Sequence, residues 1–187
     1  MADDADAPSC TSPTPTPPRA SRLIPPRTFG IVSGLKRFRS AWKAYVLQSF
    51  LAGLTVFAIL LVLSMENAVV IAALGASAFI VFGRPFDLTA RPRNVTGGHL
   101  LGFLIGSACS LLPQESMLPT LASYALAVGL SVFLMVVLYM QHPPAAATAL
   151  GVAVRGCSWE TFLAVLTFTL VLSVVHFAFK SRLRNLF

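Results

Sequence analysis

The sequence predicts an all-α integral membrane protein, a polytopic helix bundle built from about six hydrophobic segments. Of its 187 residues, 56% are hydrophobic and only 11% are charged, whereas about 25% of the residues of a soluble domain are charged. The apolar residues fall into runs separated by short polar connections, and several of these runs are long enough to cross a bilayer. These two observations make the lipid bilayer the expected surroundings of the chain.

The basic balance of the chain fits a membrane better than a nucleic acid. The formal net charge is +7, and the Lys and Arg residues lie in the tails and loops. No basic stripe interleaved with exposed aromatic residues occurs, so no nucleic-acid partner is expected. The cysteines, Cys10, Cys109 and Cys157, lie far apart and follow no metal or redox spacing, and we expect them to be reduced.

The chain divides into a tail, residues 1–40, and a transmembrane domain, residues 41–187. The tail contains a run of Ser, Thr and Pro at 12–18, which predicts a disordered, Pro-rich, basic cytoplasmic segment. Three early aspartates argue against a transit peptide, and no signal peptide is expected. A basic, aromatic anchor is expected before the first span, formed by Lys36, Arg37, Phe38, Arg39, Trp42, Lys43 and Tyr45.

Six hydrophobic segments are expected, at 45–64, 68–82, 97–112, 118–140, 145–154 and 162–179. The first and fourth are full-length spans, since about 20 helical residues cover the roughly 30 Å of hydrocarbon. The second and third are short. The fifth, with ten residues, reaches only about 15 Å as a helix.

The distribution of Lys and Arg predicts the orientation of the segments. If all six cross, ten basic residues near the span ends lie on one side and only Arg155 lies on the other. By the positive-inside rule both termini are then cytoplasmic. We expect the bacterial inner (cytoplasmic) membrane, with an organelle inner membrane as the alternative.

The most unusual stretch is His142-Pro143-Pro144, which interrupts a long apolar run. Proline is disfavoured inside a helix but is tolerated at its first position. The stretch therefore predicts the end of one helix and the start of a short one well inside the membrane. Irregular backbone at that depth requires a covering of protein or a wet cavity.

Helix starts at membrane depth are a recurring feature of transporters, because their free amides and positive dipole ends attract anions. Two starts are expected to form a small basic anion site on the cytoplasmic side. Arg93 would hold the anion, and His142 would tune access through its protonation. The expected substrate-binding residues are Arg93, Asn94, Thr96, Gly97, Gly98, His99, His142, Pro143, Pro144, Ala145, Ala146 and Thr148.

Structural roles are the alternatives for several of these residues. Arg84 and Arg91 fit a positive-inside loop, Asp87 is expected to pair with Arg84, and His176 is expected to be structural. His99 and His142 could instead be interfacial residues bonded to carbonyl groups. The glycine stripe formed by Gly98, Gly102 and Gly106 allows close helix contact, either inside the chain or in a homo-oligomer.

The two motifs resemble the HPP family of integral membrane proteins. The resemblance rests on His142-Pro143-Pro144 with 147–150, on Pro92-Arg93-Asn94 with 97–99, and on 75–78 with Phe82-Gly83. It implies four or more spanning helices, and plastid members are associated with nitrite transport. The family often has glycine after the double proline, where this chain has Ala145 and Ala146, a difference that narrows the site.

We therefore expect a transporter or channel for a small inorganic anion, with nitrite as one candidate. A membrane scaffold or assembly protein is the alternative, and an intramembrane enzyme is the least favoured reading. No catalytic residues, cofactor or metal are expected, because the histidines fall on separate segments without a metal-binding spacing. A weak identity between 72–83 and 145–156 suggests a 3+3 inverted repeat.

Overall fold

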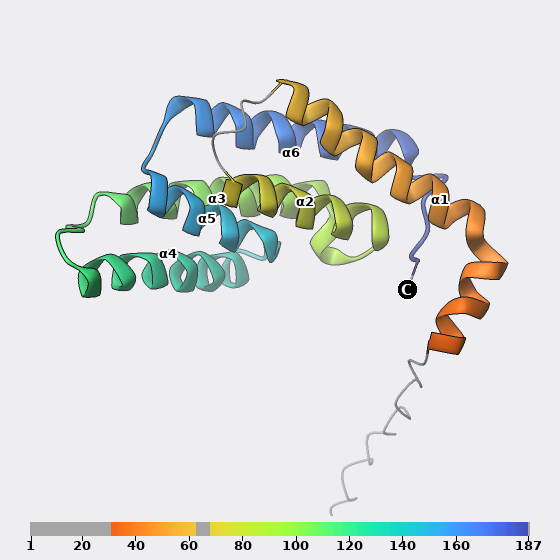
Figure 1. The fold of residues 1–187 in the computed structure, drawn as a ribbon, viewed down its shortest axis with the longest axis horizontal. Helices are drawn as coiled ribbons and strands as arrows, with labels where there is room; N and C mark the ends of the chain where they lie inside the picture. The colour runs from red at the N-terminus through yellow and green to blue at the C-terminus, as the bar shows by residue number, and fades with distance from the viewer. Residues whose placement is uncertain (1–30, 63–67, 187) are drawn as a thin grey trace, which may run out of the picture.

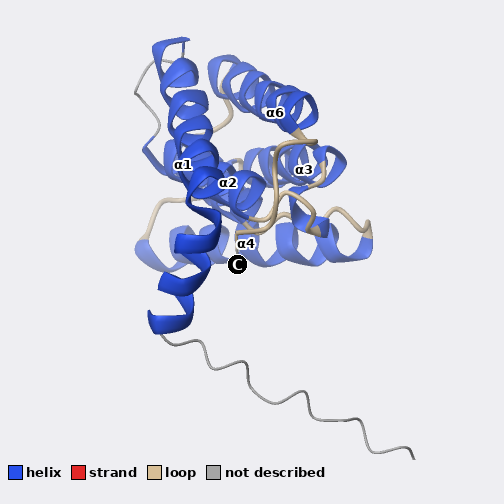
Figure 2. Cartoon of the chain, turned by 90° about the vertical axis from the view of Figure 1, so that its right-hand side faces the viewer, coloured by secondary structure: helices blue, strands red, loops and turns tan. Residues whose placement is uncertain are grey.

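The computed structural model describes residues 31–62 and 68–186, and this part of the chain is helical without strands (Figure 1; Figure 2). The predicted all-α fold is confirmed. The elements are α1 (Ile31–Val62), α2 (Ala68–Gly83), the 3-10 turn η1 (Leu88–Ala90), α3 (Pro92–Ser110), α4 (Met117–Val137), α5 (Pro144–Arg155) and α6 (Trp159–Phe179).

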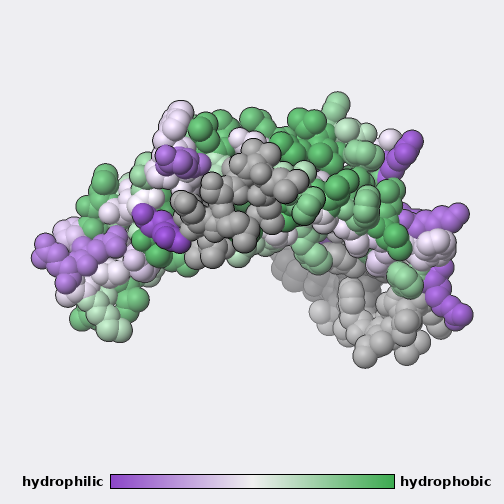
Figure 3. All heavy atoms as spheres, turned by 45° about the horizontal axis from the view of Figure 1, so that its top comes forward, coloured by the Kyte–Doolittle hydropathy of each residue, from purple (hydrophilic) through white to green (hydrophobic). Residues whose placement is uncertain are grey.

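Three helices of the described part are long and apolar enough to cross a membrane. They are Phe38–Ile59 within α1, Met117–Val137 and Trp159–Phe179, each with 21 or 22 residues, or about 32 Å of helix. Less than a third of each is buried inside the molecule, so their apolar side chains face outward. Figure 3 shows the result, a hydrophobic middle band with hydrophilic residues gathered toward the two ends.

The other three helices are shorter and lie closer to the centre of the packing. Helix α5 has 12 residues, α2 has 16 and α3 has 19. Helix α5 packs against α2, α3 and α4, and α3 also packs against α6. The short helices therefore meet one another, while the long helices cover them.

The contact between α3 and α5 depends on the glycine stripe. A Cβ atom at Gly102 would overlap the backbone carbonyl of Ala145, and one at Gly106 would overlap that of Ala149. A Cβ at Gly98 would lie 2.9 Å from the Cβ of His142. The stripe is thus used inside the chain, where α5 and the segment before it lie against the three glycines. The possible homo-oligomer stays a prediction.

Several expected boundaries move. Helix α3 begins at Pro92 rather than at residue 97, because Pro92 takes the first helical position and Arg91 precedes it in extended conformation. Helix α1 begins at Ile31 and kinks at Ala41, so residues 31–40 are helical rather than part of a disordered tail. The rest of that tail, residues 1–30, lies outside the described residues.

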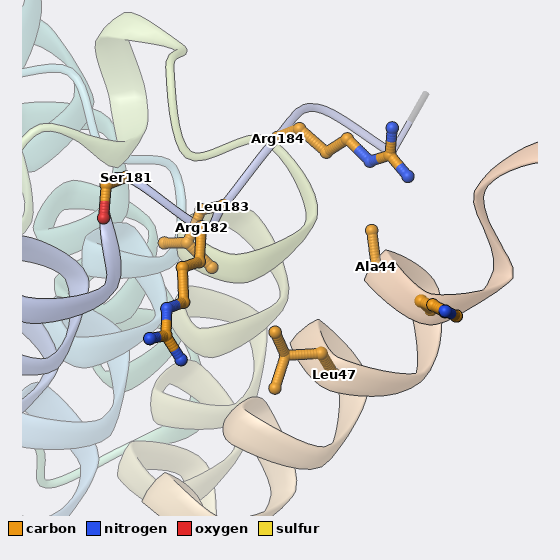
Figure 4. Close-up of a pocket in the computed structure, with 7 residues that line it drawn as sticks. Ala44, Leu47, Ser181, Arg182, Leu183 and Arg184 are labelled. Carbon is orange, nitrogen blue, oxygen red and sulfur yellow. The ribbon is translucent and has the colours of Figure 1, made fainter.

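One end of the bundle collects the basic residues. The tail after α6 folds back there, with Gln48 Nε2 bonded to the Arg184 carbonyl at 2.9 Å and Leu186 N to the Gly83 carbonyl at 2.9 Å. Lys43, Arg182 and Arg184 line an open pocket of about 560 Å³ at this end (Figure 4). The start of α1 and the described end of the chain therefore lie together, as the six-crossing arrangement requires.

The contacts between helices agree with those expected for a 3+3 repeat, in which the first three helices correspond to the last three. In such a repeat α1 corresponds to α4, α2 to α5 and α3 to α6. The contact α1·α2 then has α4·α5 as its counterpart, α3·α4 has α1·α6, and α3·α5 has α2·α6. All six pairs are in contact. The pairs α2·α5 and α3·α6 are exchanged with themselves and are also in contact. Superposition of the two halves remains the test of the inverted repeat.

Candidate functional site

The two sequence motifs, far apart in the chain, meet where α3 and α5 begin. Asn94, buried in the first turn of α3, donates from Nδ2 to the Gln141 carbonyl at 3.3 Å. One turn later Gly98 lies against His142. The absence of a side chain at Gly98 lets the segment before α5 approach α3 closely enough to place His142 beside His99.

His142 is fully buried and bonded through both ring nitrogens. Its Nδ1 lies 2.8 Å from the Thr89 carbonyl oxygen, and its Nε2 lies 2.9 Å from Ser77 Oγ. Thr89 belongs to η1, in the loop between Arg84 and Arg91 at the basic end. His142 thus makes the carbonyl bond that the structural alternative described, and it makes it as a buried residue.

His99 is also fully buried and also bonded through both nitrogens. Its Nε2 lies 2.8 Å from Ser77 Oγ, and its Nδ1 lies 2.8 Å from Thr148 Oγ1 on α5. The ring of Phe168, on α6, packs against that of His99 in a T-shaped arrangement. The ring centroids of His99 and His142 are 5.0 Å apart, and the Ser77 hydroxyl bridges the two rings.

We call these five residues the two-histidine cluster: Thr89, His142, Ser77, His99 and Thr148. When both rings are neutral and every ring nitrogen is bonded, the direction of each bond between these five residues is fixed, because the Thr89 carbonyl can only accept. His142 therefore donates from Nδ1 and accepts at Nε2 from the Ser77 hydroxyl. Ser77 must then accept from His99 Nε2, and His99 Nδ1 accepts from Thr148. Each donor in this chain has an acceptor, which a buried polar cluster requires.

The anion site expected at the helix starts is not formed as described. The Ala145 amide donates to the His142 carbonyl at 2.9 Å, and the Ala146 amide donates to the Pro143 carbonyl at 3.1 Å. Pro143 is itself in helical conformation and Pro144 begins α5, so neither supplies a donor. The expectation that the amides of α5 are free for an anion is therefore wrong for its first turn.

The start of α3, the second helix start expected to bind the anion, also differs from the prediction. Gly97, Gly98 and His99 lie in the second turn of α3, where helical amides bond to carbonyls four residues earlier. Neither Asn94 nor Thr96 caps the helix, whose preceding residue makes no side-chain cap bond. Thr96 instead contacts Ser173 on α6, with the two hydroxyl oxygens 3.4 Å apart.

Arg93 is exposed in the first turn of α3, so the structure leaves it among the basic residues of that end. His176 has the expected structural character, since its Nε2 lies 3.0 Å from the Pro85 carbonyl and ties α6 to the loop before η1. Arg84 and Asp87 form the expected ion pair at 3.0 Å. Across residues 31–62 and 68–186, no group of three His, Cys, Asp or Glu side chains is placed to hold a metal.

Ser77 and Thr89 were missed as site residues. Ser77 stands out in the sequence as the polar residue of a run of small ones, but its partners His99 and His142 lie 22 and 65 positions away. Thr89 contributes only a backbone carbonyl. The position of Ser77 among small residues was the available signal, because such a run marks a helix that packs closely.

Comparison with known proteins identifies the family. The model of the HPP transmembrane region matches residues 37–185. The chain belongs to the HPP family of integral membrane proteins. A transmembrane protein of Dictyostelium discoideum is 37% identical over 102 residues, 54% of this chain and 35% of that protein. A second one from the same organism is 34% identical over 107 residues, 56% of this chain and 34% of its own length.

The HPP chain thus spans about a third of the length of these curated relatives. No solved structure matches it. Both relatives are described as transmembrane proteins. Family membership and the helical structure together make the chain an integral membrane protein.

Proposed function

We propose that this HPP protein is a transporter or channel for a small monovalent anion, with nitrite as the first candidate, in the bacterial cytoplasmic membrane or an organelle inner membrane. The observation that carries the proposal is the two-histidine cluster, in which the side chains of Ser77, His99, His142 and Thr148 are fully buried. Polar and ionisable groups within a membrane protein are costly and mark substrate pathways by default.

The sign of the cargo follows from the surrounding charges. The cluster can gain positive charge by protonation, and the spans α2–α6 contain no Asp or Glu between their end turns. The cluster also begins at Thr89, within the loop that carries Arg84 and Arg91, so it lies next to the basic end. A mobile anion is the partner that such a site attracts.

In this proposal the anion binds beside the cluster, at the starts of α3 and α5. This place is approached past Arg93, Asn94, Thr96 and Gly97, with Pro143, Pro144 and Ala146 on the opposite side. Gly98 and Ala145 keep the two helices close, and His99, His142 and Thr148 form the polar interior. Since the amides of Ala145 and Ala146 are already bonded, the side chains of the cluster replace them as the interacting groups.

Anion flux into proteoliposomes containing the full chain tests the proposal. Chloride, nitrate and nitrite are each followed separately, with protein-free liposomes as the control, because nitrous acid crosses bilayers unaided. Uptake above the control for one of these anions supports transport. If correctly inserted protein transports none of them, the proposal fails and the scaffold alternative is favoured.

A further inference from the structure

The Ser77 hydroxyl has one proton but two neighbouring groups that can accept it, the Ala73 carbonyl and a histidine ring nitrogen. Its Oγ lies 2.9 Å from the Ala73 carbonyl oxygen of its own helix, 2.8 Å from His99 Nε2 and 2.9 Å from His142 Nε2. A serine hydroxyl donates one hydrogen bond and accepts two. The direction of the bonds at Ser77 can therefore change without moving a heavy atom.

This freedom gives the cluster room for one additional proton. If His142 gains a proton at Nε2, that N–H donates to Ser77 Oγ, and the Ser77 hydroxyl turns to His99 or to the Ala73 carbonyl. If His99 carries the extra proton instead, it donates from Nε2 to Ser77 and from Nδ1 to Thr148, while Ser77 keeps its bond to His142. In both cases each ring N–H has an acceptor, so neither charged state leaves a buried ring nitrogen unsatisfied.

We propose that His99, Ser77 and His142 form a one-proton relay, and that occupation of this relay by a proton is coupled to binding of the transported anion. In the transfer step the Nε2–H bond of His99 breaks and that proton binds Ser77 Oγ. The former hydroxyl proton of Ser77 leaves and forms an Nε2–H bond on His142. The positive charge moves from one ring to the other, and no oxidant, reductant or further reactant takes part.

The relay holds one proton rather than two because two imidazolium rings with centroids 5.0 Å apart would repel in a buried site. The surroundings supply no fixed countercharge. The ionisable groups described on the packed elements are Arg39, Lys43 and Tyr45 near the start of the α1 span, Arg93 and Cys109 of α3, Tyr124 of α4, Arg155 of α5, Glu160 and His176 of α6, and Arg84, Asp87 and Arg91 around η1. Helix α2, including Ser77, carries no charged residue.

Of these groups, the charged side chains lie near the ends of helices or spans or in the loop, and Glu160, Arg155 and Arg93 are exposed. A proton on the relay is therefore a buried charge without a neighbouring carboxylate, and such charges are costly unless they are paired. An incoming monovalent anion supplies the pair. The inference rests on the proposed anion transport for its coupling, whereas the relay itself can be tested without any transported substrate.

The first test is nitrogen-15 NMR of the histidine rings of the full chain in lipid nanodiscs. The chain has only three histidines, so single substitutions assign the signals. At high pH we expect His142 to carry its proton on Nδ1 and His99 on Nε2. On acidification both rings should shift together during uptake of one proton. Identical tautomers, or two rings that titrate independently, would overturn the relay.

Ser77→Ala tests the bridge, with Ser131→Ala as the matched control. Ser131 is equally buried, and its hydroxyl bonds a carbonyl of its own helix, α4, at 2.8 Å. Ser77→Ala should uncouple the titrations of the two rings, whereas Ser131→Ala should leave them coupled. If the two variants behave alike, Ser77 is not the bridge. The tautomers of the unaltered chain decide the matter should Ser77→Ala fail to fold.

The coupling is tested in proteoliposomes with a pH-sensitive dye inside and nitrate outside. Nitrate uptake should acidify the interior, an imposed inward proton gradient should drive accumulation, and Ser77→Ala should lose that accumulation. Nitrate flux that moves no protons overturns the coupling. Absence of any anion flux refutes the proposed function instead, and the NMR measurement still decides whether the relay exists.

Discussion

The long helices α1, α4 and α6 differ from the short helices α2, α3 and α5 in the side chains that they expose and bury. The long ones expose large apolar side chains, such as Phe57, Phe133 and Phe177, each more than half exposed. The short ones bury polar residues, among them Ser77, His99 and Thr148, each with no exposed surface. Only the long set passes a test of length and apolarity for a membrane span.

The difference shows that apolar sequence is needed where a helix faces lipid, and that a helix covered by other helices can carry polar groups. Between α3 and α5, glycine and alanine replace large side chains, so that backbones touch. Lipid offers little hydrophobic drive for helix association, and such close packing is what holds inner helices together. The inner helices can therefore hold a hydrogen-bonded cluster that the outer ones could not.

The largest expected effect concerns whether the inner helices also connect the two faces of the membrane. Cys157, between α5 and α6, is exposed at the end opposite the tail of the chain. In a variant with Cys10→Ser, Cys109→Ala and Ser181→Cys, the residue at 157 should react with an impermeant maleimide from outside, and the residue at 181 only from the cytoplasmic side. The physical reason is that α5 must cross for Cys157 to lie outside, and α6 then returns the chain. Labelling of 181 from outside, or of both residues from one side, would refute the six-crossing model.

The second effect is on packing of the inner helices. Gly102→Ala should destabilise the protein by about 1–3 kcal/mol, because the new Cβ overlaps the Ala145 carbonyl and α5 must move. Gly129→Ala on the outer helix α4 meets nothing within 4 Å and should change stability by less than about 1 kcal/mol. Thermal unfolding in detergent measures both. Equal melting of the two variants would contradict the close α3–α5 contact.

The sequence predicted the elements well because the hydrophobic runs are clear, and α2, α5 and α6 begin within three residues of their expected starts. The start of α3 was placed at residue 97, where the hydrophobic segment begins, whereas the helix starts five residues earlier, at Pro92. The meeting of His99 with His142 could not be read from the sequence. It depends on Ser77, which lies on a third helix, and on the backbone carbonyl of Thr89 in η1. Every residue has such a carbonyl, so the sequence does not mark this one.

A smaller effect is expected when the stability lost with a hydrogen bond of the cluster is compared with that lost with a bond inside one helix. Thr148→Val keeps the shape of the side chain but leaves His99 Nδ1 without its donor, which should cost about 1–2 kcal/mol. Thr169→Val is the control, because that buried hydroxyl bonds the Leu166 carbonyl of its own helix at 3.1 Å. Chemical unfolding in detergent should show a larger loss for Thr148→Val, and the reverse order would argue against the bond between His99 and Thr148.

The smallest effect is expected at the basic end, where removal of one exposed charge should change nitrate transport less than a change in the buried cluster. Arg93 was expected to hold the anion, which would make its removal severe. Because the side chain is exposed, solvent and salt screen its charge, and an exposed ionic contact changes affinity by at most about fivefold. Arg93→Gln should therefore raise the half-saturating nitrate concentration modestly at low salt and hardly at all at high salt.

Lys180→Gln is the control for Arg93→Gln, because Lys180 is exposed at the same end, directly after α6. If the basic end acts only by attracting anions toward the bundle, the two variants should give similar, salt-sensitive changes in nitrate flux. If Arg93→Gln alone abolishes saturable flux at every salt concentration, then Arg93 holds the anion directly. Substrate contact would in that case belong to the basic end, and the buried cluster would serve the proton alone.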